Sequence, residues 1–392
     1  MRRKQVDFRS LGPLLSGAAA LFAGISSGVL GLCGPFTDVA ADSFCPFVLE
    51  IFALGITTGT TVTTYDPASN VNRLQMAAFL SRTVDGALKR GGRRAALDRF
   101  WTSKNGDVLG ITTLGAPATF AFLPASDGAD VWVPSLFGNT VSRVRASDGR
   151  LLETWTGATG AAAARCAAGR VFVTGETMPG ALYRIDPAQP AGAVTTVVSN
   201  LGDFSVGVAF DGARIWTANS GSVSIVTPGA SIPWTVTTVV GFGTLYGAIF
   251  DGANIWVTDG DNNTIRKLDS NGAALLTITI AMGAHPQFPV FDGSNIWVPN
   301  YSANTVSVIR AVSGAVLATL TGNQLNLPYS AAFDGERILV TDYGGDRVSL
   351  WKAADLTAIG FFPTGASSAP TGACSDGLQF WLTIRTNQLA RF

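Results

Sequence analysis

The stretch Asp251-Gly252-Ala253-Asn254-Ile255-Trp256-Val257 decides the fold, because the chain repeats it with variations seven times. The turn glycines of the seven copies lie 40–43 residues apart: Gly128, Gly169, Gly212, Gly252, Gly293, Gly335 and Gly377. In six copies the fourth residue after the glycine is large and apolar: Trp132, Trp216, Trp256, Trp297, Leu339 and Trp381. In the remaining copy the corresponding residue is Phe172, one position earlier. A regular period of this length predicts one structural unit built several times over.

Each copy is predicted to hold four short strands. Alternation around the tryptophan, as in Ile255-Trp256-Val257, is typical of a strand, and a further apolar strand precedes each turn. A third strand opens with triplets such as Asn139-Thr140-Val141, and a fourth follows a glycine, as in Gly149-Arg150-Leu151-Leu152. Asp-Gly, present in six copies, supplies the positive φ values of a tight hairpin, so we interpret these aspartates as turn residues. Four antiparallel strands per repeat predict propeller blades.

The seventh repeat stops at Phe392, after its third strand. A segment with the fourth-strand pattern, Gly106-Asp107-Val108-Leu109-Gly110-Ile111-Thr112, stands before the first repeat and belongs to no other blade. We therefore expect residues 107–114 to complete the last blade and close the ring, which removes exposed sheet edges. The prediction is a mainly β protein with a seven-bladed propeller over residues 107–392, closed by an N-terminal strand.

These repeats resemble the YVTN and NHL-type propellers and, more loosely, the streptogramin lyase family. The lyase resemblance implies an enzyme that uses a histidine, acidic side chains and Mg²⁺ to open a lactone by elimination. His285 is the single histidine of the chain, so that hypothesis depends on it. Because the sequence has no phosphate loop and no paired carboxylates at catalytic spacing, we favour a protein without catalysis. A lyase or hydrolase acting at the channel mouth remains the alternative.

The candidate ligand-binding residues lie at the end of the blades where the channel opens. They come from the starts of inner strands and from the loops between second and third strands: Tyr246, Gln287, Tyr329, Asp259, Asn300 and Asp342. The last three share one repeated position with Asn219, so turn hydrogen bonds are the alternative interpretation. Loop carboxylates, Asp261 among them, also allow Ca²⁺, although no cofactor is predicted and Mg²⁺ enters only through the lyase resemblance.

The first residues have the layout of an export signal. Met1-Arg2-Arg3-Lys4 is basic, and residues 11–32 carry no charge. We expect residues 1–32 to be a signal peptide, with a hydrophobic anchor as the alternative, and the protein to be secreted or located at the cell surface. In such an oxidising compartment Cys33 and Cys45 are candidates for a disulfide, the alternative being two thiols.

Residues 33–92 are predicted to form a small helical module, followed by a linker over 93–106. The blocks Phe36-Thr37-Asp38-Val39, Leu54-Gly55-Ile56-Thr57-Thr58-Gly59, Tyr65-Asp66-Pro67 and Asn72-Arg73-Leu74-Gln75 resemble a single S-layer homology motif. The resemblance implies binding of a cell-wall polymer or envelope component through Arg73. Gln75 replaces the family's glutamate, and such motifs usually act in threes, so a purely structural module is the alternative.

Composition narrows the remaining classes. Lys plus Arg equals Asp plus Glu at 27 each, which argues against nucleic acid as a partner. Four cysteines without a Cys-x-x-Cys pair and one histidine exclude a Cys/His metal site, and Cys166 and Cys374 are predicted to be buried free thiols. The leading prediction is an exported, envelope-associated propeller that acts as a binding scaffold for a protein, glycan or small ligand. A self-associating structural subunit of a surface layer is a further alternative.

Overall fold

The computed structural model describes residues 36–80 with gaps, 110–115, 119–385 and 387–392. The chain divides into two compact units, residues 1–101 and 102–392. The export segment, Cys33 and the linker over 93–106 lie outside the described residues, so the predictions for them remain predictions. None of the helical residues that are described belongs to a helix with the length and hydropathy of a membrane span.

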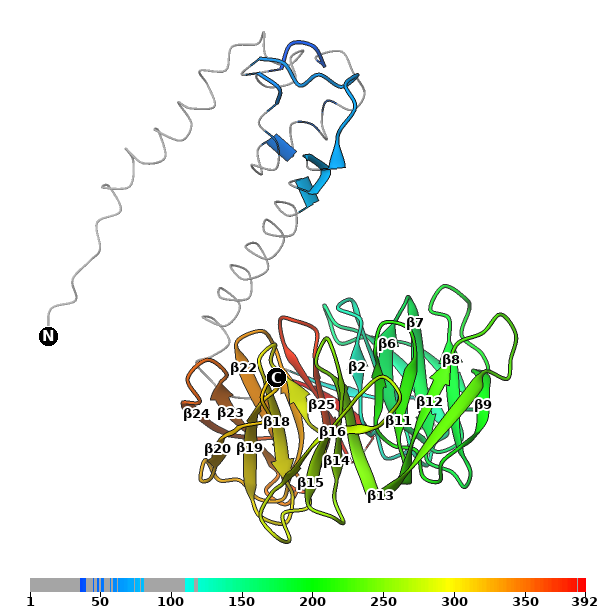
Figure 1. Cartoon of the computed structure of the whole chain (residues 1–392), viewed down its shortest axis with the longest axis vertical. Helices are drawn as coiled ribbons and strands as arrows, with labels where there is room; N and C mark the ends of the chain where they lie inside the picture. Colours follow the sequence, from blue (N-terminus) through cyan, green and yellow to red (C-terminus); the bar gives the residue numbers. More distant parts are fainter. Residues whose placement is uncertain are drawn as a thin grey trace, which may run out of the picture. The chain divides into compact units, whose positions relative to one another are not determined.

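The second unit consists of antiparallel β-sheets, most of them four-stranded (Figure 1). Four of these sheets take their strands in sequence order: β2 (Ala125–Ser126), β3 (Asp130–Ser135), β4 (Thr140–Arg145) and β5 (Leu151–Thr156); β6 (Ala161–Ala167), β7 (Arg170–Gly175), β8 (Gly180–Ile185) and β9 (Thr195–Leu201); β17 (Val290–Phe291), β18 (Asn295–Asn300), β19 (Thr305–Arg310) and β20 (Val316–Leu320); β21 (Pro328–Phe333), β22 (Arg337–Asp342), β23 (Arg347–Lys352) and β24 (Ala358–Pro363). Each predicted repeat unit therefore corresponds to one antiparallel sheet in these regions.

Two further repeats are joined by one long strand. The seven-stranded sheet contains β10 (Val208–Phe210), β11 (Ile215–Ala218), β12 (Ser220–Thr227), β13 (Thr235–Phe250), β14 (Ile255–Asp259), β15 (Thr264–Leu268) and β16 (Ala274–Thr279). The first half of β13 pairs with β12 and its second half pairs with β14. The sequence predicted two separate strands here. Gly241, with a φ of +102°, lets the chain change direction without a loop.

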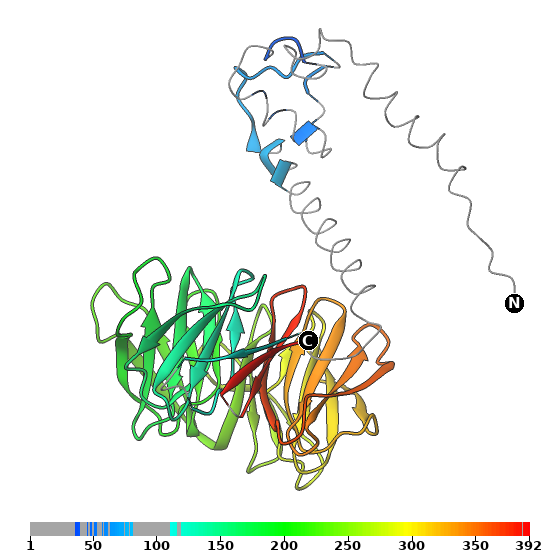
Figure 2. The ribbon, with the colours of Figure 1, turned by 180° about the vertical axis from the view of Figure 1, so that it is seen from behind.

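The two ends of the second unit share one sheet. Strand β1 (Gly110–Thr113) pairs antiparallel with β27 (Gln388–Arg391), which continues to β26 (Phe380–Ile384) and β25 (Pro370–Ser375). In Figure 2 the red C-terminal strands accordingly lie beside the cyan start of this unit. The Thr383 hydroxyl donates to the carbonyl oxygen of Phe122 at 2.6 Å, which links this sheet to the first repeat.

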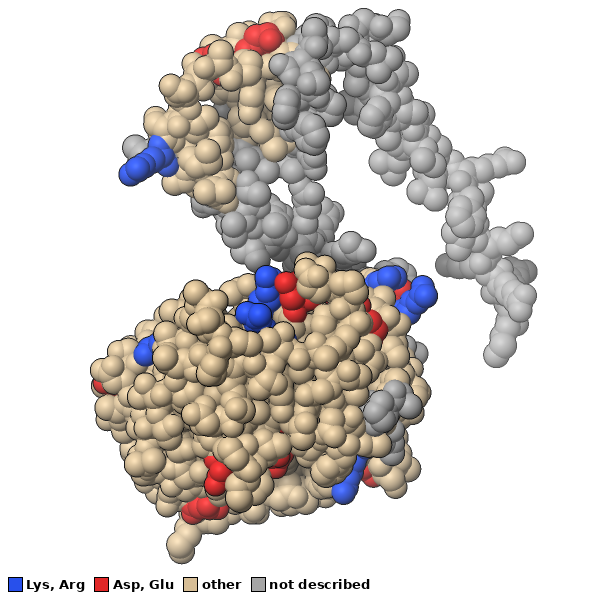
Figure 3. All heavy atoms as spheres, turned by 90° about the vertical axis from the view of Figure 1, so that its right-hand side faces the viewer, with Lys and Arg blue, Asp and Glu red and all other residues tan. Residues whose placement is uncertain are grey.

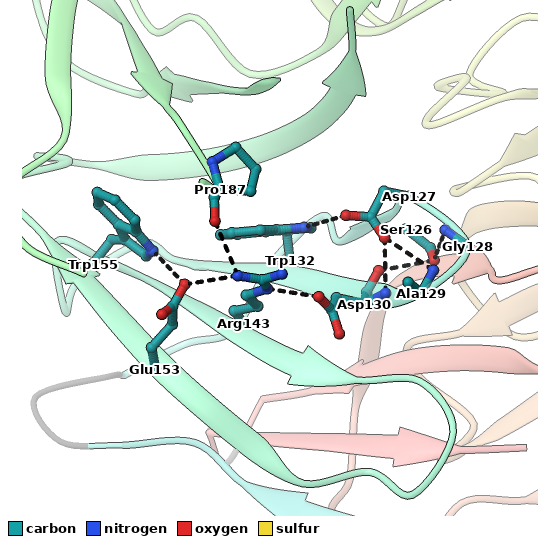
Figure 4. A network of polar contacts seen from close by, with 10 residues as sticks. All are labelled: Ser126, Asp127, Gly128, Ala129, Asp130, Trp132, Arg143, Glu153, Trp155 and Pro187. Atoms are coloured by element: carbon teal, nitrogen blue, oxygen red, sulfur yellow. Dashed lines mark hydrogen bonds and ion pairs between the residues drawn. The ribbon is translucent and has the colours of Figure 1, made fainter. Parts of the chain in front are cut away.

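The Asp-Gly turns differ from the prediction in one respect, because only the glycine has a positive φ, as at Gly252 with +94°. The aspartate instead accepts hydrogen bonds. Asp251 accepts from the backbone N–H groups of Ala253 and Asn254 and, at 2.7 Å, from the indole Nε1–H of Trp256. The same indole bond recurs in four other repeats, of which Figure 4 shows the first: Asp127–Trp132, Asp211–Trp216, Asp292–Trp297 and Asp376–Trp381.

The buried tryptophans form the cores between neighbouring sheets. Trp256 of β14 is fully buried and packs with Ile296 and Val298 of the next sheet. Trp132 of β3 likewise packs with residues of β6, β7 and β8. On the face of the second unit shown in Figure 3, basic and acidic side chains lie near one another without a patch of one sign. The stability of this unit therefore comes from apolar packing between sheets.

In the first unit the described residues show a small core and a helix cap. Phe36, Val39 and Val48 form a buried cluster. Asn72 donates its N–H to Gln75 Oε1, and Gln75 donates its N–H to Asn72 Oδ1, both at 2.9 Å. This reciprocal pair is a capping box, and helical residues follow it. No complete helix lies among the described residues, so the two-helix module remains a prediction; Arg73 is exposed.

Candidate functional site: an aromatic cluster at the mouth of the channel

Aromatic side chains gather at one end of the sheets, where the loops between second and third strands meet the loops that enter each first strand. Antiparallel pairing brings these two sets of loops to the same end. Ring centroids lie between 5.1 and 6.3 Å apart along a continuous series of contacts. We call this group the aromatic mouth: Phe120, Phe122, Phe137, Tyr246, His285, Phe288, Tyr301, Tyr329 and Tyr343.

Tyr329 of β21 lies at the centre of the aromatic mouth. Its ring contacts those of Phe288 at 5.2 Å, Phe122 at 6.2 Å and Tyr301 at 5.9 Å. Burial raises the pKa of the Tyr329 phenol well above its usual value, so the phenol is neutral at physiological pH. The sheet that contains β2 packs against the sheets that contain β6 and β25, whereas the sheet that contains β17 is not its neighbour. The 5.9 Å contact between Phe122 and Phe288 therefore spans the channel and narrows it at this level.

The backbone of His285 belongs to a repeated loop. Its φ is 54°, and its N–H donates to Asn263 Oδ1 at 2.9 Å. The asparagines that open third strands make the same bond to the loop of the following sheet in two other places: Asn139 with Gly160, and Asn304 with Leu327. Those partners also have positive φ values. The strained backbone of His285 is thus a scaffold feature, and only its side chain is particular to this loop.

The imidazole of His285 is held between Gln287 and Tyr246. Gln287 Nε2 lies 2.7 Å from Nδ1, and the Tyr246 hydroxyl lies 3.5 Å from Nε2. The ring is thus fixed from two sides, and its Nε2 edge faces Tyr246. Gln287 is 1% exposed, and its backbone carbonyl oxygen accepts from the Thr258 hydroxyl. Of the six predicted ligand-binding residues, Tyr246, Gln287 and Tyr329 lie together here.

Two charged residues of the mouth escaped the sequence reasoning. Glu176, directly after β7, is half-buried, which raises its pKa, and its charge raises the pKa values of Tyr246 and Tyr329. Arg385, directly after β26, donates to the Tyr343 hydroxyl at 2.7 Å and lies 5.4 Å from the centre of the Phe120 ring. No pattern marks them in the sequence, because the position four residues after the repeated aromatic or Leu339 varies, and tyrosine is the one residue found there twice: Leu136, Glu176, Ser220, Gly260, Tyr301, Tyr343 and Arg385.

Asp259, Asn300 and Asp342 make hydrogen bonds inside their own loops and sheets. Asp259 accepts from the N–H of Gly243 at 2.9 Å and forms an ion pair with Arg266 at 3.3 Å. Asn300 donates to the hydroxyls of Thr305 and Ser307.

Asp342 accepts from the Ser349 hydroxyl and from the N–H of Asn326. Burial raises the pKa of Asp342 to about 7, despite these bonds. All three side chains are at most 1% exposed, so their geometry fits the turn interpretation better than the ligand interpretation.

The described residues contain no group of three His, Cys, Asp or Glu side chains arranged to hold a metal ion. The residues present therefore do not fit the Mg²⁺ ion that the lyase resemblance implies, and we derive no step through it. Cys166 and Cys374 are free thiols, as predicted, but each is only half-buried, because both lie beside a central cavity rather than inside a core.

The antiparallel sheets and their packing define the class of the protein, a β-propeller. Solved propellers match it over 72% of this chain. Virginiamycin B lyase from Staphylococcus aureus matches over 97% of its own length with a TM-score of 0.62 and 16% identity. A streptogramin B lyase matches over 96% with a TM-score of 0.61 and 15% identity, and the WD40 propeller domain of Doa1 over 95% with 0.60 and 12%. These likenesses show the fold alone. No family model matches the sequence, and neither does any curated protein.

Proposed function

We propose that the protein is an exported, envelope-associated propeller that acts as a binding scaffold, attached through an S-layer-homology-like module over residues 33–92. The observation that carries the proposal is the aromatic mouth. A continuous group of rings, with the carboxyl groups of Glu176 and Asp261 and the guanidinium of Arg385 beside it, is the usual composition of a ligand site. The basic start and the motif blocks of the first unit support export and attachment.

The scaffold in this proposal is a closed ring of seven blades. The seven repeats support the count, since β13 serves as the last strand of one blade and the first of the next. The pairing of β1 with β27 and the bond from Thr383 to Phe122 support the closure. Closure matters for function because it holds loops from all blades in one arrangement, so the ligand meets a preformed surface.

The ligand proposed for the mouth is a glycan or a protein with flat apolar surface. Tyrosine rings offer apolar faces, while the hydroxyls of Tyr301 and Tyr343 offer directional hydrogen bonds. Loops at the same end carry apolar side chains that are exposed by 43–97%: Phe137, Met178, Phe204 and Met282. Exposed apolar groups around a polar and aromatic centre are typical of interaction surfaces.

A double variant, Tyr301→Ala with Tyr343→Ala, tests this site. The probes are a glycan array and purified cell-wall polysaccharide, and we expect affinity for any glycan bound to fall at least about tenfold, because each ring is worth about 1 kcal/mol beyond its buried area. Val312→Ala is the matched control, since Val312 is 89% exposed at the opposite end. Unchanged binding by the double variant, or equal loss in the control, would contradict the proposal.

Attachment through the first unit is tested separately by cell fractionation. The full chain is compared with a variant that lacks residues 33–92 but keeps the export segment. We expect the shortened protein to leave the envelope fraction and enter the medium. An equal envelope share for both proteins would rule out attachment by this module and leave the binding site in the second unit untouched.

A lyase is the second candidate, and the position of His285 favours it. A histidine whose imidazole lies among the rings of the mouth is placed to exchange a proton with a bound substrate. One of the similar structures is a catalytically inactive histidine-to-alanine variant of virginiamycin B lyase with quinupristin. Incubation of this protein with quinupristin, followed by mass spectrometry, is the test. Absence of turnover, or equal turnover by His285→Ala, would reject this candidate.

A further inference from the structure

A second cavity lies on the other side of the rings that narrow the channel. Residues from the innermost strand of every repeat line it, and its volume is about 430 Å³. Its lining extends to Ser126, Phe333 and Ser375, which adjoin the Asp-Gly turns, so the cavity faces the end opposite the aromatic mouth. We call it the lower chamber. Its size is at the lower end of the range for small-molecule sites.

Arg165 is the only charged residue that lines the lower chamber. It lies in β6 and is exposed, and the surface that it shows is part of the chamber wall. Among the described residues its guanidinium has neither a hydrogen bond nor an ion pair. Burial lowers its pKa, and no carboxylate counteracts that effect. Because Arg165 is exposed to the chamber and has no partner in the protein, its five N–H donors are open to a ligand.

The neighbouring thiols and hydroxyls do not balance this charge. Burial raises the pKa of Cys166 to about 12 and that of Cys374 well above its usual value, so both thiols are neutral at pH 7. The hydroxyls of Ser126 and Ser375 each donate to a backbone carbonyl of their own turn, at 3.0 Å. The chamber therefore has a positive charge and no anion of its own.

The acidic residues at this end of the channel are already occupied. Asp127 and Asp376 accept indole N–H groups, and Asp130 lies 2.6 Å from the guanidinium of Arg143 in an ion pair (Figure 4). They are held by the turn scaffold and are not directed at Arg165. The positive charge of Arg165 is consequently available to a ligand that enters the chamber.

We propose that the lower chamber binds a small oxyanion, either inorganic phosphate or a carboxylate group, with Arg165 as its main ligand. The planar guanidinium can donate two parallel hydrogen bonds to either anion, a geometry that a point charge such as an ammonium group lacks. The apolar wall, which includes Val208, Phe291 and Ala332, limits the ligand to a compact molecule. This site is separate from the aromatic mouth and does not depend on the function proposed there.

Isothermal titration calorimetry of the full chain with inorganic phosphate, and separately with succinate, tests the proposal. We expect saturable binding of one anion per chain. The anion with the higher affinity shows whether the natural ligand carries a phosphate or a carboxylate group. Arg165→Met should weaken that binding at least about tenfold, because a hydrogen bond to a charged group is lost. Arg165→Lys keeps the positive charge but not the planar guanidinium, so its affinity for the anion should lie between those of the original protein and Arg165→Met.

Arg310→Met is the matched control. Arg310 lies at the same end of the unit, at the close of β19, but outside the chamber, and its variant should bind as the original protein does. Circular dichroism checks that each variant is folded. If Arg165→Met fails to fold, the affinity of Arg165→Lys is compared with that of the original protein instead. Binding of neither anion by the original protein, or equal binding by the folded Arg165 variants, would overturn the proposal.

Discussion

Replacement of Asp251 by alanine would show how the repeated Asp-Gly turn stabilises the propeller. The carboxylate accepts from two backbone N–H groups, at 2.8 and 2.6 Å, and from the Trp256 indole at 2.7 Å, and it forms an ion pair with Lys267 at 3.4 Å. Its side chain is 5% exposed and Trp256 is fully buried. In Asp251→Ala the buried indole N–H has no acceptor, whereas the turn N–H groups reach water.

The expected cost follows from these contacts. A buried donor without a partner costs about 1–3 kcal/mol, and the two turn hydrogen bonds add about 1 kcal/mol in total. We therefore expect Asp251→Ala to lower the free energy of unfolding by about 3 kcal/mol. Urea denaturation, followed by tryptophan fluorescence, measures this change as a lower midpoint with an unchanged slope.

Asp269→Ala is the matched control, because Asp269 caps the turn between β15 and β16 with two backbone N–H bonds but accepts from no indole. We expect it to cost about 1 kcal/mol. In a Trp256→Phe background the indole donor is gone, so Asp251→Ala should cost less than in the original background, with the two turn bonds and the Lys267 ion pair making up the remaining cost. Equal costs for Asp251→Ala and Asp269→Ala in the original background would refute the assigned role of the indole bond.

Three further predictions concern other parts of the chain. In the folded protein the pKa of Asp342 is about 7, above the ordinary 3.8 of an aspartate. The folded state therefore binds more protons between these two values, and the free energy of unfolding falls by up to about 4 kcal/mol as pH rises through them. In Asp342→Asn the free energy of unfolding, measured by denaturation at pH 5 and pH 8, should differ less between the two pH values than in the original protein. An equal difference in both proteins would contradict the role of Asp342. Deletion of residues 107–114 should expose the edge of β27 and cause concentration-dependent association in light scattering; a monomer of unchanged stability would argue against it. Asn72→Ala should cost about 1 kcal/mol locally, seen as faster amide exchange over residues 73–80, and unchanged exchange would contradict the capping box.

The parts of the molecule that repeat were predictable, whereas the parts that differ between repeats were only partly so. The Asp-Gly turns and tryptophans indicate the strands directly, because the same local contacts form each time. Tyr246, Gln287 and Tyr329 were found because they depart from the repeat. Glu176 and Arg385 were missed, because a single charged residue in a loop has no pattern around it.

The sequence by itself determined the β-sheet repeats, their length and the strand between residues 107 and 114 that the last repeat needs, since periodicity and turn chemistry are local properties. Tertiary structure decided which side chains meet. It brought Tyr246, His285 and Tyr329 into one aromatic mouth, and it left Arg165 alone in a chamber lined by every repeat. Such encounters depend on the packing of strands far apart in the chain, which no local pattern records.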